Sequence, residues 1–145
     1  MNIGKQKKSD NAARCYAKAV QHFQQGNLED AALEVKRSLW MAPEFADAIF
    51  MLGIIESQRG KTEDEIRLIG SAIRKNAGRP SYHYNFGVIL HSAGRLQDAM
   101  KAYQVATGLK PDFAEAHSNL AGVLSELSRH VEALHAADRA IHVNP

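Results

Sequence analysis

The chain has 145 residues, 45% of them hydrophobic, and its 18 basic and 16 acidic side chains leave a formal net charge of +2 at pH 7. This balance gives no broad cationic surface, so we expect neither nucleic acid nor an anionic membrane as a partner. Membrane insertion is not expected either, because no stretch approaches 18 consecutive apolar residues. The one cysteine, Cys15, cannot form an internal disulfide, which favours a cytoplasmic location.

Residues 1–11 form a short polar stretch with three lysines, Lys5, Lys7 and Lys8. We interpret this stretch as a flexible leader, since unanchored chain termini fray. Arg14 and Lys18 interrupt the segment that follows, which excludes the apolar core of a signal peptide. A single domain is expected over residues 12–145, a length sufficient to bury a core.

From Ala12 onward the sequence repeats every 34 residues, without insertion or deletion, in four repeats: 12–45, 46–79, 80–113 and 114–145. Places 8, 20 and 27 of the repeats carry small side chains, in the order Ala19, Gly53, Gly87, Ala121; Ala31, Glu65, Ala99, Ala133; and Ser38, Ala72, Ala106, Ala140. Two helices approach to about 8 Å only where such residues meet. Each repeat is therefore predicted to be a tightly packed helix pair. Glu65 is the exception, so either its helix packs more loosely or its carboxylate has a partner.

In chain order, the first helix of a repeat is predicted to end at a left-handed glycine and the second helix before a proline, with one departure from each rule. These residues are Gly26 and Pro43 in the first repeat, and Gly60 with Ala77 in place of the proline in the second. The third repeat has Gly94 and Pro111, and the fourth has Ser128 in place of glycine, followed by Pro145. The whole chain is therefore expected to be all-α.

This pattern resembles the tetratricopeptide repeat. The third repeat matches that family best, with His83, Phe86, Gly87, Leu90, Gly94, Ala99, Tyr103, Ala106 and Pro111. The resemblance implies an α-solenoid of helix–turn–helix repeats that forms a right-handed superhelix. It also implies a non-catalytic protein–protein interaction module, in which the first helices line a concave groove that binds a peptide or partner segment.

Within the family, places 2, 5, 6, 9, 12 and 13 of the first helix face the groove. Places 5 and 9 lie on one helix face, and in the first three repeats they carry aromatic and aliphatic side chains: Tyr16, Phe50 and Tyr84, then Val20, Ile54 and Val88. These side chains form an apolar peptide-binding surface or complete the core between helices; both interpretations stay open.

Two asparagines stand at place 6 of the last two repeats, Asn85 and Asn119. A side-chain amide donates and accepts hydrogen bonds, so it can pair with a peptide backbone of any sequence. A similar asparagine series lines the repeat arrays of O-linked N-acetylglucosamine transferases. Simple solvation of the helix is the alternative.

No catalytic motif, metal site or cofactor is expected. His83 and His117 stand at place 4, where the family keeps a large, partly buried residue, so we interpret them as core or rim histidines. Cys15 stands at the same place of the first repeat, which predicts an inert thiol.

The last predicted helix carries an apolar face formed by Leu134, Ala137 and Ile141. In the second repeat the corresponding face receives the next repeat, and here no repeat follows Pro145. Two alternatives to a free interaction module therefore stay open. The chain is the substrate-recruiting region of a larger transferase, such as a glycosyltransferase, or it is a self-assembly module that forms homo-oligomers through this helix.

Overall fold

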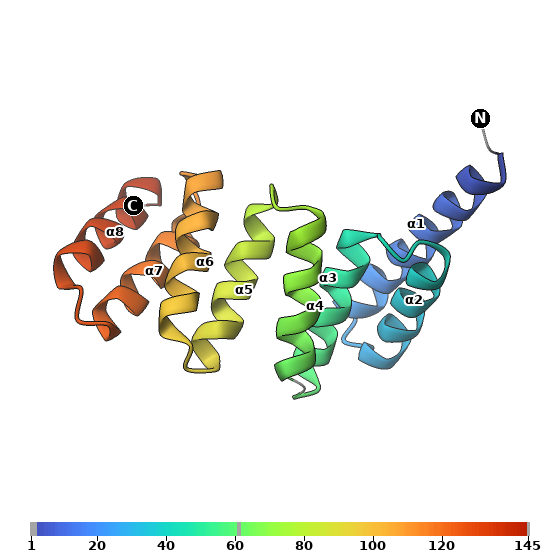
Figure 1. Cartoon of the computed structure of the whole chain (residues 1–145), viewed down its shortest axis with the longest axis horizontal. Coiled ribbons are helices and arrows are strands. Elements are labelled where there is room, and N and C mark those ends of the chain that lie inside the picture. The colour runs from blue at the N-terminus through green and yellow to red at the C-terminus, as the bar shows by residue number, and fades with distance from the viewer. Residues whose placement is uncertain (1–2, 61, 145) are drawn as a thin grey trace. The chain divides into compact units, whose positions relative to one another are not determined.

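A computed structural model of the chain describes residues 3–60 and 62–144, and the described residues form eight α-helices joined by short turns (Figure 1). The helices are α1 (Ile3–Gln24), α2 (Leu28–Met41), α3 (Ala46–Gln58), α4 (Thr62–Lys75), α5 (Pro80–Ser92), α6 (Leu96–Leu109), α7 (Ala114–Glu126) and α8 (His130–Val143). Each predicted repeat holds two of these helices, so the all-α class and the helix–turn–helix repeats are confirmed.

The turn inside each repeat ends its first helix through one left-handed residue, as predicted for the three glycines. Gly26, Gly60 and Gly94 have φ angles of 78°, 76° and 74°, and Ser128 has a φ of 60°. Ser128 therefore keeps the backbone of the turn although it has a Cβ atom, which makes this conformation costly for it. Two second helices end two residues before a proline, α2 before Pro43 and α6 before Pro111. Pro145 lies outside the described residues.

The small residues lie where paired helices meet. A Cβ atom added to Gly87 in α5 would lie 2.6 Å from a ring carbon of Tyr103 in α6, and one added to Gly53 in α3 would lie 2.7 Å from a side-chain carbon of Ile69 in α4. In the first repeat the Ser38 hydroxyl donates a hydrogen bond of 2.8 Å to the carbonyl oxygen of Ala12. The sequence period thus identified true helix contacts.

Helix α1 begins at Ile3, nine residues earlier than the repeat pattern predicts. The described part of the expected flexible leader is helical, which corrects that expectation. Lys and Gln are good helix formers, and the Gln6 amide donates to the Asp10 carboxylate four residues later at 3.1 Å, a pairing that supports a helix. The basic stretch therefore extends the first helix.

Glu65 is buried in α4, with 3% of its surface exposed. Burial raises the pKa of its carboxyl group, and a hydrogen bond with Ser57 acts in the opposite direction. Its Oε1 atom has no hydrogen-bond partner among the described residues. Of the two alternatives, the structure supports a partner, although Ser57 leaves one oxygen unsatisfied.

The chain divides into two compact units, the first ending at Lys75 and the second beginning at Asn76. Unit 1 contains α1 to α4 and unit 2 contains α5 to α8. A single domain over residues 12–145 and a right-handed superhelix stay predictions.

Candidate functional site

In unit 1, the four predicted groove residues lie on α1 and α3 and are partly buried: Tyr16, Val20, Phe50 and Ile54. The Tyr16 ring packs against Phe45, the residue before α3, with ring centroids 5.0 Å apart and planes inclined by 55°. Tyr16 therefore contributes to the contact between repeats and still exposes part of its side chain. The two interpretations of this position are compatible.

Unit 2 brings together two of the predicted groove residues, from neighbouring first helices. Tyr84 of α5 packs against Phe113, the residue before α7, with a centroid distance of 4.9 Å. The Asn119 amide of α7 donates a hydrogen bond of 3.4 Å to the Tyr84 hydroxyl. An aromatic ring and an amide from adjacent repeats thus form one partly buried cluster.

Asn85 follows Tyr84 in the sequence, but its amide forms a hydrogen bond within its own helix. Its Nδ2 atom donates to the carbonyl oxygen of Ser81, one turn earlier in α5, at 2.8 Å. This bond occupies one amide hydrogen, and the side chain retains a second hydrogen and an acceptor oxygen. Val88, at place 9 of the same helix, is partly buried. Neither peptide contact nor simple solvation is decided by this arrangement.

Beneath the cluster lies Tyr103 of α6, whose ring centroid is 6.1 Å from that of Tyr84. Burial raises the pKa of Tyr103 to about 12, a rise that the Asn119 amide reduces and Tyr84 increases. The phenol therefore stays protonated at neutral pH. Its ring packs directly against Gly87 of α5.

Sequence reasoning did not single out His91 and Glu126, which stand at places 12 and 13 of the first helices. His91 Nε2 lies 2.7 Å from a Glu126 carboxylate oxygen, so this pair links α5 to α7. Both places face the groove in the family, and that signal was sufficient to find them. The pair adds a polar end to the surface that contains Tyr84 and Asn119.

The place-4 residues are structural, as expected for core histidines. His83 and His117 each expose 9% of their surface. Each Nε2 atom hydrogen-bonds a carbonyl oxygen six residues earlier, that of Ala77 at 2.8 Å and that of Pro111 at 2.9 Å. Cys15 is partly buried; burial raises the pKa of its thiol, and Glu34 raises it further. Both effects disfavour the reactive thiolate.

The apolar face predicted on the last helix is exposed within unit 2. Leu134 and Ile141 expose 61% and 62% of their surfaces, and Ala137 between them is partly buried. Within residues 3–60 and 62–144, no cluster of three or more His, Cys, Asp or Glu side chains is arranged to hold a metal ion. None of the helices described is both long and apolar enough to cross a membrane.

Paired helices with small residues at their contacts, repeated in register, define a helical repeat protein. Two family models match the sequence, "Tetratricopeptide repeat" over residues 16–80 and "TPR repeat" over residues 87–128. The chain belongs to the tetratricopeptide repeat (TPR) family. It is a module of the protein-interaction type, since repeat arrays act through extended binding surfaces.

A curated relative is the "TPR repeat-containing thioredoxin TTL4" of Arabidopsis thaliana, 26% identical over 108 residues. The match covers 73% of this chain but only 16% of that protein. The chain therefore corresponds to a small part of this relative.

Three solved structures share the fold. MamA matches with a TM-score of 0.85 and 20% identity, over 92% of this chain and 78% of that one. YrrB, described as "a TPR protein with an unusual peptide-binding site", matches with a TM-score of 0.78 and 21% identity, over 92% and 69%. An O-GlcNAc transferase mutant of Thermobaculum terrenum matches with a TM-score of 0.79 and 26% identity, over 91% of this chain and 26% of the transferase.

Proposed function

We propose that the protein is a non-catalytic adaptor that binds a peptide segment of a partner on the groove-facing side of its first helices. The surface of unit 2 formed by Tyr84, Asn85, Val88 and Asn119 is the favoured contact. The observation that carries this proposal is the cluster in which Asn119 of α7 donates to Tyr84 of α5. The cluster presents an aromatic ring and amide groups together, and all four residues are partly buried.

Such a surface suits a peptide because the ring packs against an apolar side chain while the amides pair with the peptide backbone. Ser118 and Gly122 of α7 are exposed beside it, so no bulky side chain of α7 obstructs approach at these places. YrrB is described as having a peptide-binding site, which supports peptide recognition by this fold. In unit 1, Tyr16, Val20, Phe50 and Ile54 occupy the equivalent places and extend the proposal to α1 and α3.

The proposal is tested by a double variant, Tyr84→Ala with Asn119→Ala, used as bait in quantitative capture of partners from cell extract. We expect the captured partners to be lost while helical circular dichroism is retained. The matched control is Gln97→Ala with Lys101→Ala, two exposed residues on the outer helix α6, which should capture normally. Equal capture by both double variants would contradict the assignment of the groove.

A second candidate is that the chain recruits substrates for a larger transferase. The observation in favour of this candidate is the match to the O-GlcNAc transferase mutant. That match covers 91% of this chain and 26% of the transferase, so an array of this kind can be a small part of a larger enzyme. The chain itself would still catalyse nothing, and its peptide surface would select substrates for a separate catalytic domain. The full-length reading frame decides between the two candidates. A catalytic domain encoded in the same frame supports the transferase, and its absence supports the adaptor.

A third candidate is self-assembly, in which a second copy covers the exposed face of α8. Leu134 and Ile141 lie seven residues apart on this face and are mostly exposed. This candidate needs no partner other than a second copy of the chain. A cytoplasmic location stays a prediction from the single cysteine.

A further inference from the structure

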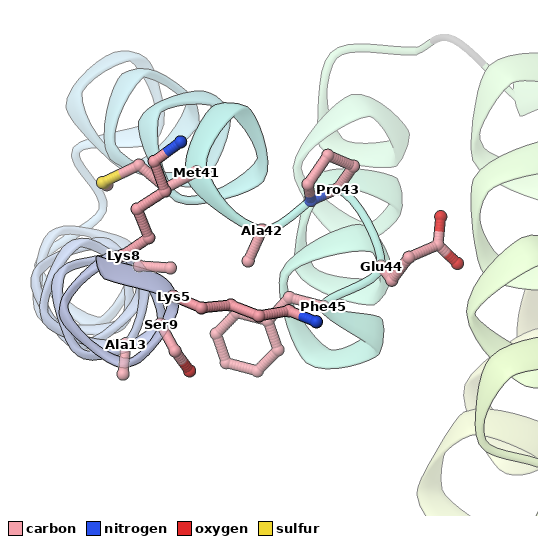
Figure 2. A pocket seen from close by; sticks show the side chains of 10 residues that line it. Lys5, Lys8, Ser9, Ala13, Met41, Ala42, Pro43, Glu44 and Phe45 are labelled. Carbon is pink, nitrogen blue, oxygen red and sulfur yellow. The ribbon is translucent and has the colours of Figure 1, made fainter. Parts of the chain in front are cut away.

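Unit 1 contains a pocket of about 580 Å³ that lies away from most of the groove places. Residues of the first turns of α1, among them Lys5, Lys8, Ser9 and Ala13, form one wall, and the connection between α2 and α3, residues 41–45, forms the other (Figure 2). Of these residues only Ala13 stands at a groove place of the family, place 2. The pocket is therefore a different surface from the one proposed above.

The pocket exists because α1 is longer than the other first helices. Helices α3, α5 and α7 begin at place 1 of their repeats, at Ala46, Pro80 and Ala114, whereas α1 begins nine residues before its place 1. The pocket-lining residues of α1 are spaced at i, i+3, i+4, i+7 and i+8 from Lys5, which is the spacing of one helix face. Lys7 is outside this face and does not line the pocket.

The floor of the pocket is apolar. The Phe45 ring is fixed by its contact with Tyr16 at 5.0 Å, and Ala12 is held against α2 by the hydrogen bond from Ser38. Met41 and Pro43 add further apolar lining. A volume of about 580 Å³ falls within the roughly 300–1,000 Å³ of typical ligand pockets, so one or two large side chains fit.

The rim of the pocket is cationic. Figure 2 shows the Lys5 side chain extending across the pocket beside the Phe45 ring, and the Lys8 side chain running toward Met41. In the described part of the chain, neither ammonium group forms an ion pair with this chain, whereas Glu44, the one acidic residue of the lining, is paired with Lys75. The positive charge of the two lysines is therefore available to a ligand.

We propose that this pocket is a second peptide site, which binds a segment carrying one or two large apolar side chains next to Asp or Glu. The apolar side chains occupy the floor formed by Ala12 and Phe45, and the carboxylate pairs with Lys5 and Lys8 at the rim. The site goes beyond the groove proposal, because Lys5, Lys8 and Ser9 of its lining lie on the extension of α1 that precedes the first repeat. Its ligand differs as well, since a neutral amide surface has no preference for acidic segments.

The test measures fluorescence anisotropy of a fluorescein-labelled synthetic peptide in which Leu and Phe are flanked by Asp and Glu, titrated with the whole chain. We expect saturable binding that weakens as salt is added. One control peptide replaces the two acidic residues by Lys, and a second replaces Leu and Phe by Ser; neither should bind. Absence of binding by the acidic apolar peptide, or equal binding by either control peptide, would overturn the proposal.

Variants of the chain then locate the site. Lys5→Glu with Lys8→Glu should weaken binding by about tenfold or more, since both attractive charges become repulsive. Ala13→Phe, a change at an exposed residue of the pocket wall, should also abolish binding by filling the space. The matched control is Lys7→Glu, which changes the same charge on the opposite side of α1 and should leave binding unchanged.

Nuclear magnetic resonance separates this proposal from the groove proposal. On addition of the acidic apolar peptide, amide shifts should change at residues 5–13 and at Met41, Ala42, Glu44 and Phe45. Changes confined to Tyr84, Asn85 and Asn119 would overturn the pocket and leave the groove intact. Loss of partner capture by the Tyr84 and Asn119 variant has no bearing on the pocket, so each proposal fails independently.

Discussion

At the scale of single residues, Gly87 shows most directly how the repeat pattern dictates packing. The Tyr103 ring is fully buried against it, and an added Cβ would lie at 2.6 Å from the ring. The period predicted a small residue at this place. It did not identify Tyr103 as the group in contact, because the period gives the places that need space and not the side chains that fill it.

Gly87→Ala should therefore destabilise the protein by about 1–3 kcal/mol, the usual cost of overpacking a core. The matched control is Gly122→Ala in α7, where an added Cβ meets nothing within 4 Å. That change should stabilise the protein by about 0.5–1 kcal/mol, because alanine favours the helix over glycine. Thermal unfolding followed by circular dichroism checks both, and a change of the same sign in both variants would contradict the packing described.

Glu65 connects stability to pH. The pKa of its carboxyl group is raised in the folded state, so the folded chain holds its proton to a higher pH than the unfolded chain does. The stability associated with this proton is complete below the unfolded pKa and is lost as the pH rises through the folded pKa. Glu65 is therefore most costly at neutral pH.

Glu65→Gln should raise the thermal midpoint at pH 7, and the gain should shrink as the pH is lowered toward 4. The control is Glu63→Gln, since Glu63 is exposed on the same helix and should show no such trend. Melting curves across this pH range provide the measurement. A gain from Glu65→Gln that does not depend on pH would show that the carboxylate is not the source of the cost.

At the scale of helices, the four repeats share one turn geometry although only three contain the glycine. Ser128 ends α7 with a φ of 60°, so the surrounding helices impose the left-handed conformation on an unfavourable residue. The sequence showed that Ser128 replaces the glycine of the other repeats. It could not show that the backbone of this turn keeps the same left-handed conformation. The start of α1 was not predicted, because its residues are polar and precede the repeat pattern. Local helix propensity and the hydrogen bond from Gln6 to Asp10 support this part of the helix.

Ser128→Gly should stabilise the protein by about 1 kcal/mol, since a left-handed conformation costs a residue with a Cβ atom roughly 1–2 kcal/mol. The reciprocal change, Gly94→Ser at the equivalent turn, should lower stability by a similar amount. Chemical denaturation of both variants measures the two effects. Equal destabilisation by both changes would mean that the side chain of Ser128, and not its backbone, determines the turn.

At the scale of the whole molecule, the exposed face of α8 bears on the oligomeric state. Leu134 and Ile141 are mostly exposed, and burying a Leu or Ile is worth roughly 1.5–3 kcal/mol. The apolar pattern of this helix was legible in the sequence because its spacing matches that of the earlier repeats. The group that covers this face could not be predicted, because the repeat period of the sequence carries no information about a partner.

Light scattering at several concentrations tests self-association through this face. We expect a concentration-dependent dimer that Leu134→Glu with Ile141→Glu dissociates, because like charges would face each other across a symmetric contact. Gln97→Glu with Gln104→Glu adds two charges at the same spacing on the exposed face of α6 and should leave the dimer intact. A monomer at all concentrations, or a dimer that resists the α8 changes, would contradict this interface.

The short turns within each repeat also affect how the chain folds during its synthesis. Helices that pack as pairs follow one another directly in the sequence, as α1 with α2 and α3 with α4 do. Contacts between near neighbours form quickly, because little chain entropy is lost in closing them. During synthesis the N-terminal part emerges first, and unit 1 needs no residue beyond Lys75 for its internal contacts. Its hydrophobic surfaces can therefore pair before α5 has left the ribosome, which shortens the time during which they are open to aggregation.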